Sequence, residues 1–127
     1  MKATPFLLFQ GQAKEALDLY RATVPYYEEL LLHEHADGPQ AGQIAMARIR
    51  ISGLELMLYD SAPVHDFTFT PSTSTFIECD DEQQLRQLAE KISDGGKALM
   101  PVDNYGFSTL FTWVVDRFGV SWQFNLP

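Results

Sequence analysis

The sequence predicts an α+β fold in which two βαβββ modules form cupped mixed sheets. The chain has 127 residues, about the length of one domain, and 46% of them are hydrophobic, which is enough for a sizeable core. The order strand, helix and three strands occurs twice, in modules of about 1–60 and 72–127. Corresponding helix positions, Ala13 and Leu85, lie 72 residues apart, and two hairpin glycines, Gly53 and Gly119, lie 66 apart. This internal repeat predicts a single domain, residues 1–127, built by duplication.

The elements of the first module are predicted from apolar periodicity and its interruptions. A short apolar strand runs from Thr4 to Phe9, and Gly11 separates it from a helix that ends before Pro25. Strands are expected over 28–35, 43–51 and 54–60, and Ser52-Gly53 joins the last two as a two-residue hairpin turn. The helix carries one apolar stripe, formed by Ala13, Ala16, Leu17, Tyr20 and Val24.

The second module repeats this order after a loop over residues 61–71. A strand over 72–79 is followed by a helix, for which Asp80 is the predicted N-cap, with Gln83 at capping-box spacing. Gly95-Gly96 ends the helix. Strands are expected over 97–100, 108–116 and 120–126, and the turn 117–119 closes the final hairpin. The stripe of this helix consists of Leu85, Leu88, Ala89 and Ile92.

Each module should keep one face of its sheet free of helix, because a single helix covers only one face of four strands. We expect the two helix-free faces to close around a cavity. Side-chain alternation across the first hairpin pairs Arg50 with Glu55 and Arg48 with Met57, and across the second pairs Trp113 with Gln123. The helix side then receives an apolar set, which comprises Ile49, Ile51, Leu54, Leu56, Leu58, Trp122 and Phe124.

The cavity side combines aromatic side chains with a few uncharged hydrogen-bonding groups, as is typical of a small-molecule pocket. The candidate ligand-binding residues are Phe9, Arg48, Met57, Tyr59, Ser74, Phe111, Trp113 and Gln123. The arginines on this side could bind an anionic ligand. Because Glu55 lies opposite Arg50 and is expected to neutralise it, Arg48 is the better candidate.

Three segments carry a resemblance to a known family: Pro5 to Ala16, Phe76 to Asp80, and Asp116 to Gln123. They resemble the PhnB-like family, often labelled 3-demethylubiquinone-9 3-methyltransferase-like, of the vicinal oxygen chelate superfamily. This superfamily also contains glyoxalase I, extradiol dioxygenases and the bleomycin- and fosfomycin-resistance proteins. The resemblance covers almost the whole chain and implies a glyoxalase-like fold, commonly assembled as a homodimer.

The resemblance also implies four metal-ligand positions, which fall on Pro5, Met57, Ser74 and Gln123. Only Gln123 could coordinate a hard divalent ion, because proline offers no side-chain donor, a thioether is too soft and a lone hydroxyl is weak. We therefore expect no metal and no other cofactor. A second metal candidate, His33 with His35, lacks a carboxylate on the same strand face.

Two further residues, His65 and Cys79, are of types that can take part in catalysis. His65 lies in the 61–71 loop and could act as a general acid or base, although a solvated loop histidine is the favoured interpretation. Cys79, the single cysteine, is expected on the helix side as an inert apolar group, and it excludes an internal disulfide. Catalytic residues stay unassigned.

Composition excludes several function classes. The formal net charge of −8 disfavours nucleic acid and anionic membranes as partners. The chain has no membrane-spanning run and no signal-peptide pattern, so we expect a cytoplasmic protein. Phosphate-binding and nucleophile-elbow motifs are absent, and so is a glycine-rich strand-to-helix turn of the kind that holds S-adenosylmethionine.

The leading hypothesis is a homodimeric PhnB-like protein that binds a small, partly aromatic or amphipathic molecule without the usual metal. One alternative is a metal-dependent lyase, isomerase or dioxygenase of the same superfamily, with Gln123 as a ligand. The other is a non-catalytic dimerisation or interaction domain.

Overall fold

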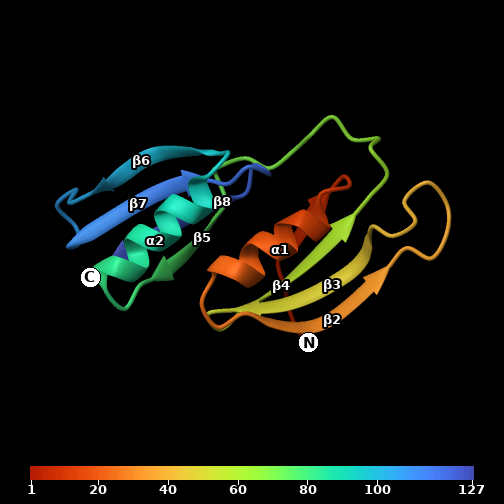
Figure 1. The fold of residues 1–127 in the computed structure, drawn as a ribbon, viewed down its shortest axis with the longest axis horizontal. Helices are drawn as coiled ribbons and strands as arrows, with labels where there is room; N and C mark the ends of the chain where they lie inside the picture. Colours follow the sequence, from red (N-terminus) through yellow and green to blue (C-terminus); the bar gives the residue numbers. More distant parts are fainter. The chain divides into compact units, whose positions relative to one another are not determined.

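The computed structural model describes all residues from 1 to 127 and divides them into two compact units, Met1–Phe67 and Thr68–Pro127 (Figure 1). Each unit holds one helix and one mixed four-stranded sheet, and the helix lies across one face of its own sheet. The division falls inside the 61–71 segment that the sequence predicts as a loop. Neither helix is long and apolar enough to cross a lipid bilayer.

The first unit has the predicted order of elements. They are β1 (Phe6–Phe9), α1 (Ala13–Thr23), β2 (Glu28–Glu34), β3 (Ile44–Ile51) and β4 (Leu54–Asp60). The sheet order is β1-β4-β3-β2, with β1 parallel to β4 and the other pairs antiparallel. The stripe of α1 is buried as predicted, whereas β1 begins two residues later than expected, after Pro5.

The β3–β4 hairpin has the predicted turn. Ser52 (φ 46°) and Gly53 (φ 90°) both adopt the left-handed conformation that a tight two-residue turn requires. The predicted pairs from Ile51–Leu54 to Ala47–Leu58 are all formed, so the helix-side and helix-free faces separate as expected. Leu54 is an exception because it is 38% exposed at the start of its strand, beside the turn.

The second unit repeats the topology of the first. It comprises β5 (Ser74–Glu78), α2 (Glu82–Ser93), β6 (Lys97–Asp103), β7 (Leu110–Val115) and β8 (Ser121–Leu126). The sheet order is β5-β8-β7-β6, again with a parallel first pair. The sixth strand extends three residues beyond the predicted end at Met100. It can include Pro101 because it is an edge strand whose register shifts twice along its length.

The predicted N-cap of α2 is wrong by one residue. Asp81, not Asp80, is the cap, and its Oδ1 accepts a hydrogen bond of 2.8 Å from the backbone N–H of Gln84. Gln84 in turn accepts the backbone N–H of Asp80 through Oε1, also at 2.8 Å. The return bond reaches the residue before the cap and not the cap itself, so the reciprocal pattern of a capping box is only partly formed, although both aspartates have a glutamine three residues later.

A buried carboxylate organises the first unit. Asp60, at the end of β4, is fully buried, and its Oδ1 accepts the backbone N–H groups of Gly11 (2.9 Å) and Ala13 (3.0 Å). Its Oδ2 accepts the N–H of Ile44 at 2.9 Å. Since the cap residue Gln12 makes no side-chain cap bond, Asp60 supplies the N-terminal cap of α1 from a distant strand.

A second buried carboxylate has a similar role in the final hairpin. Asp116 accepts the backbone N–H groups of Phe118 and Val120 through Oδ1, each at 3.0 Å, and the indole N–H of Trp122 through Oδ2 at 3.1 Å. These bonds hold the 117–119 turn to β8.

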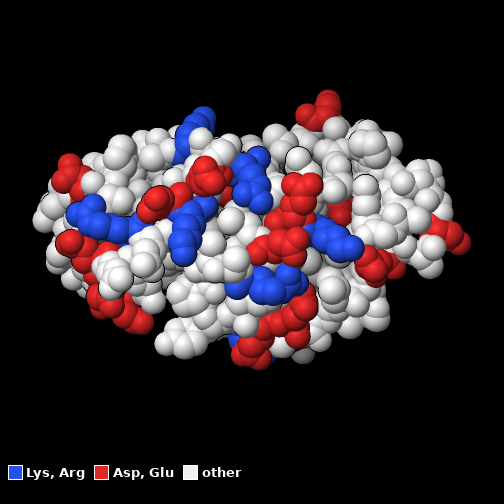
Figure 2. All heavy atoms as spheres, viewed as in Figure 1, with Lys and Arg blue, Asp and Glu red and all other residues white.

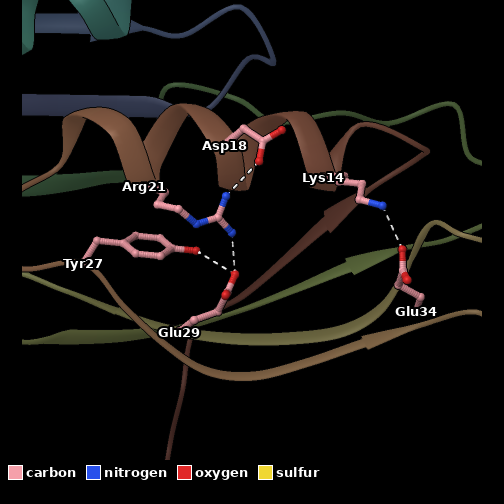
Figure 3. A network of polar contacts seen from close by, with 6 residues as sticks. All are labelled: Lys14, Asp18, Arg21, Tyr27, Glu29 and Glu34. Atoms are coloured by element: carbon pink, nitrogen blue, oxygen red, sulfur yellow. Dashed lines mark hydrogen bonds and ion pairs between the residues drawn. The ribbon is translucent and has the colours of Figure 1, made fainter.

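Ion pairs join α1 to the edge strand β2 (Figure 3). Lys14 Nζ lies 2.8 Å from Glu34 Oε2, and Arg21 Nη2 lies 2.5 Å from Glu29 Oε1. The same view shows the Tyr27 hydroxyl directed at Glu29. These pairs are largely solvated, so each contributes little to stability. In Figure 2, acidic and basic side chains are interspersed over the visible face, without a continuous basic patch for nucleic acid.

Candidate functional site

The helix-free face of the second sheet holds four of the eight predicted pocket residues. Helix α2 packs on β6, β7 and β8, and Trp122 and Phe124 of β8 are fully buried. Because alternate side chains of a strand point to opposite faces, Ser121, Gln123 and Asn125 lie on the face away from α2. We call this surface the open face of the second unit.

Strand register arranges the open face in three rows across β5, β8, β7 and β6. The first row is Ser74, Ser121, Val115 and Lys97, the second is Phe76, Gln123, Trp113 and Met100, and the third is Glu78, Asn125, Phe111 and Asp103. The predicted pairing of Trp113 with Gln123 is confirmed. Four of the predicted pocket residues, Ser74, Phe111, Trp113 and Gln123, therefore share one face.

Aromatic side chains cluster around Phe111 on this face. The ring centroid of Phe111 lies 6.4 Å from that of Phe76, 5.0 Å from that of Phe107 and 6.2 Å from that of Tyr105. Phe111 is only 5% exposed, whereas Phe76 is 51% and Phe107 62% exposed. Tyr105 and Phe107 lie in the β6–β7 loop, so strand alternation in the sequence does not predict their place in the cluster. Two aromatic residues flanking a glycine there were the available signal.

Hydrogen bonds link the polar side chains of the first two rows. Trp113 Nε1 donates to Ser121 Oγ at 2.8 Å, and the hydroxyls of Ser121 and Ser74 are 2.5 Å apart. These bonds fix the orientation of the indole ring. The half-buried amide of Gln123 lies beside them, between Phe76 and Trp113 in the register.

Asn125 has an unusual environment in the third row. The residue is only 8% exposed, and Oδ1 is the one buried side-chain nitrogen or oxygen atom in the chain without a hydrogen-bond partner. The backbone carbonyl of Asn125 accepts the N–H of Cys79 at 2.7 Å, so the main chain is satisfied. A buried amide oxygen without a donor is energetically unfavourable, and natural proteins contain few of them.

The first sheet also has a helix-free face, with Met57, Tyr59 and Arg48 on it. The Phe6 and Tyr59 rings are 6.0 Å apart, and the His35 ring meets Tyr59 edge-on at 5.9 Å. Phe9 does not belong to this face. It alternates with Leu8, pairs with Asp60 and is 2% exposed, so it is a core residue on the α1 side. The expectation that both helix-free faces share one cavity stays a prediction.

The predicted charge pairing around Arg48 is wrong. Glu55 Oε1 lies 3.2 Å from Arg48 Nη1, and Glu55 Oε2 lies 2.6 Å from Lys2 Nζ. The hydrogen bond from Lys2, with help from Arg48, lowers the pKa of Glu55. Arg50 instead pairs with Glu28, directly opposite on β2, at 3.3 Å. Arg48 is therefore already partnered by a carboxylate, which weakens its claim to bind an anionic ligand.

The side chains at the implied metal positions do not fit a metal centre. Pro5 has no side-chain donor and Met57 offers only a thioether, while the Ser74 hydroxyl is bonded to Ser121. No group of three or more His, Cys, Asp or Glu side chains is arranged to hold an ion. In the second candidate, His35 Nε2 lies 2.9 Å from the backbone oxygen of Asp60.

Cys79 and His65 lie in different surroundings, one buried and one in an exposed loop. Cys79 is buried, and burial together with the charge of Asp80 raises the pKa of its thiol to about 11, so the thiol is protonated and a poor nucleophile at neutral pH. The His65 ring stacks on Phe67 at 4.6 Å, in the exposed loop.

A shallow groove of about 280 Å³ lies on the other side of the second sheet, between α2 and β6. Small and apolar side chains such as Ala89, Ala98 and Val114 line it, and the one cation at its rim, Arg86, is 3.4 Å from Glu82. The groove includes none of the predicted pocket residues.

Comparison with a family model and with a solved structure points to the same family. The family described as 3-demethylubiquinone-9 3-methyltransferase matches residues 1–125. A solved structure described as a putative 3-demethylubiquinone-9 3-methyltransferase, PhnB protein, from Bacillus cereus is 36% identical. The match covers 100% of both chains, with a TM-score of 0.93.

Two more distant proteins extend the comparison. Protein YjdN of Escherichia coli strain K12 is 23% identical over 99% of this chain and 95% of its own length. A glyoxylase/bleomycin resistance protein/dioxygenase domain from Frankia sp. EAN1pec is 14% identical, covering 100% of this chain and 97% of that one, with a TM-score of 0.69. At that identity the likeness concerns the fold alone, which is the glyoxalase-like fold the sequence predicts.

Proposed function

The chain belongs to the PhnB-like, 3-demethylubiquinone-9 3-methyltransferase family and has the vicinal oxygen chelate fold; from this premise we propose that it binds a small, partly aromatic or amphipathic molecule on the open face of the second unit. The proposed binding uses no metal. The aromatic cluster carries the proposal, because a buried Phe111 lies among rings that are half exposed. Phe76 and Phe107 would gain burial by covering a ligand, and Gln123 and Asn125 would orient it.

The residues do not fit the methyl donor that the family description implies. A site for S-adenosylmethionine needs free backbone N–H groups at a glycine-rich strand-to-helix turn. At the start of α1 these groups are bonded to the Asp60 carboxylate, and at the start of α2 the Asp81 side chain holds the N–H of Gln84. A cofactor that bound through these backbone N–H groups would have to displace a side chain of the protein at either turn.

The same residues support a metal-free interpretation of the superfamily's fold. Of the four implied ligand positions, only Gln123 offers a suitable oxygen, and it lies between aromatic side chains. A single amide oxygen does not hold a divalent ion, so Gln123 is assigned to hydrogen bonding with the ligand.

We further propose that the protein is a cytoplasmic homodimer. The supporting observation is that Phe6, on the edge strand β1 of the first sheet, is 49% exposed. Exposed apolar edges favour association with another chain. Light scattering on the purified protein is expected to give twice the chain mass of 14.4 kDa. A monomer mass at micromolar concentration would contradict the dimer.

Binding can be tested with N-phenyl-1-naphthylamine, a neutral aromatic probe whose fluorescence rises in apolar surroundings. We expect saturable binding at one probe per chain. Phe76→Ala and Phe107→Ala should each weaken it about tenfold, because each removes a ring that covers the ligand.

Phe67→Ala is the matched control, since Phe67 is 57% exposed but lies outside the open face. Equal weakening by all three variants, or no saturable binding, would refute the proposal. Stoichiometric binding of zinc, nickel or iron, measured by calorimetry, would refute its metal-free part.

A further inference from the structure

The third row of the open face is acidic at both ends. It runs across the sheet from Glu78 through Asn125 and Phe111 to Asp103, with an acidic residue at each end. Lys97, the cation of the open face, belongs to the first row instead. A ligand lying along β8 would therefore meet acceptor atoms and negative charge at the third row.

The other polar groups of this face are satisfied or partly in water. The indole N–H of Trp113 and the hydroxyls of Ser121 and Ser74 are bonded to one another, and Gln123 is only half buried. Asn125 Oδ1 differs because it is buried and has no partner. An amide oxygen can only accept a hydrogen bond, so the missing partner must be a donor.

Asn125 is also placed where an aromatic ligand would be held. It is the direct cross-strand partner of Phe111, the ring at the centre of the aromatic cluster, and it is the neighbour of Glu78 on the parallel strand. Because Oδ1 is covered in the free protein, a donor attached to an aromatic ring would reach it after neighbouring side chains move aside, with the ring against the cluster. A carboxylate or phosphate at this position would face two acidic side chains and has no donor to offer.

We infer that the open face selects neutral aromatic alcohols or amines, whose O–H or N–H donates to Asn125 Oδ1. This inference rests on the proposed function and names the ligand class for the same site. The selection favours ligands with a donor, because they supply the hydrogen bond that Oδ1 lacks in the free protein, whereas ligands without a donor leave it unpaired.

The test compares two probes of nearly equal size, 2-naphthol and 2-fluoronaphthalene, in displacing N-phenyl-1-naphthylamine. Only 2-naphthol has a donor. We expect the wild-type protein to bind 2-naphthol about tenfold more tightly. In Asn125→Leu, which keeps the branched shape of the side chain, the preference should fall below twofold. Gln87→Leu, an exposed amide on α2, is the matched control and should keep the full preference.

The outcomes separate this inference from the proposed function. If both probes displace N-phenyl-1-naphthylamine equally from the wild-type protein, ligand binding stands and the role of Asn125 is refuted. A preference that persists in folded Asn125→Leu also refutes it. If N-phenyl-1-naphthylamine itself shows no saturable binding, the proposed function fails and the inference fails with it; if it binds but neither naphthalene displaces it, only the inference is refuted. The wild-type comparison needs no variant, so it holds even if Asn125→Leu does not fold.

Discussion

Replacing Asp60 with alanine is expected to lower the free energy of unfolding by about 3–5 kcal/mol, which makes it one of the most damaging single changes in the chain. The carboxylate is fully buried and accepts three backbone N–H groups, from Gly11, Ala13 and Ile44. In the variant these donors lose their acceptor inside the protein, and α1 loses its only side-chain cap. Urea unfolding followed by circular dichroism measures the loss.

Hydrogen exchange locates the effect. The amides of Gly11, Ala13 and Ile44 should lose protection in Asp60→Ala more than those of β7 and β8 in the other unit. Asp66→Ala, at an exposed loop position, is the control and should change stability by less than about 0.5 kcal/mol. A stability loss for Asp60→Ala no larger than that of the control would show that the three hydrogen bonds do not anchor the helix.

Gly96→Ala should destabilise the second unit by about 3 kcal/mol or more, through a steric clash. A Cβ atom at this position would lie 1.9 Å from the backbone oxygen of Val115 and 2.7 Å from the carbonyl carbon of Asp116. Both contacts are with backbone, so no side-chain rotation can relieve them. The variant must move the start of β6 away from β7, which breaks the Lys97–Val115 pairing.

Gly38→Ala is the matched control for this change. An added Cβ at Gly38 would meet nothing within 4 Å, but the residue has a φ of +78°. Gly38→Ala should therefore lower the free energy of unfolding by only about 1 kcal/mol, the penalty for a left-handed backbone conformation. Because Gly96 is not in the left-handed region, a larger loss there measures the contact with Val115. Thermal melting of both variants tests this prediction. Equal melting temperatures would show that Gly96 does not lie against the backbone of Val115.

Strand pairing next to a short turn can be predicted from the sequence. The Trp113–Gln123 pairing followed from the length of the 117–119 turn, and it correctly placed Phe111 on the same face as these two residues. The turn Ser52-Gly53 likewise set the β3–β4 register. Alternation placed Phe9 on the wrong face of the sheet. Strand β1 belongs to no hairpin, so no turn fixes which of its residues face α1.

Other features depended on contacts that no local pattern contains. Glu55 was expected to neutralise Arg50, yet it bonds Arg48 and Lys2, because long charged side chains reach diagonal neighbours as easily as opposite ones. Tyr105 and Phe107 joined the candidate site through loop conformation, which strand periodicity does not describe.

By itself, the sequence determined the duplicated βαβββ order, the two hairpin registers and the faces of the strands they join, since periodicity and turn length are properties of neighbouring residues. Only the tertiary structure decided that Asp60 caps a helix 47 residues away, and that Asn125 Oδ1 is buried without a donor. The physical reason is that hydrogen-bond partners and burial depend on groups that come together only when the chain folds.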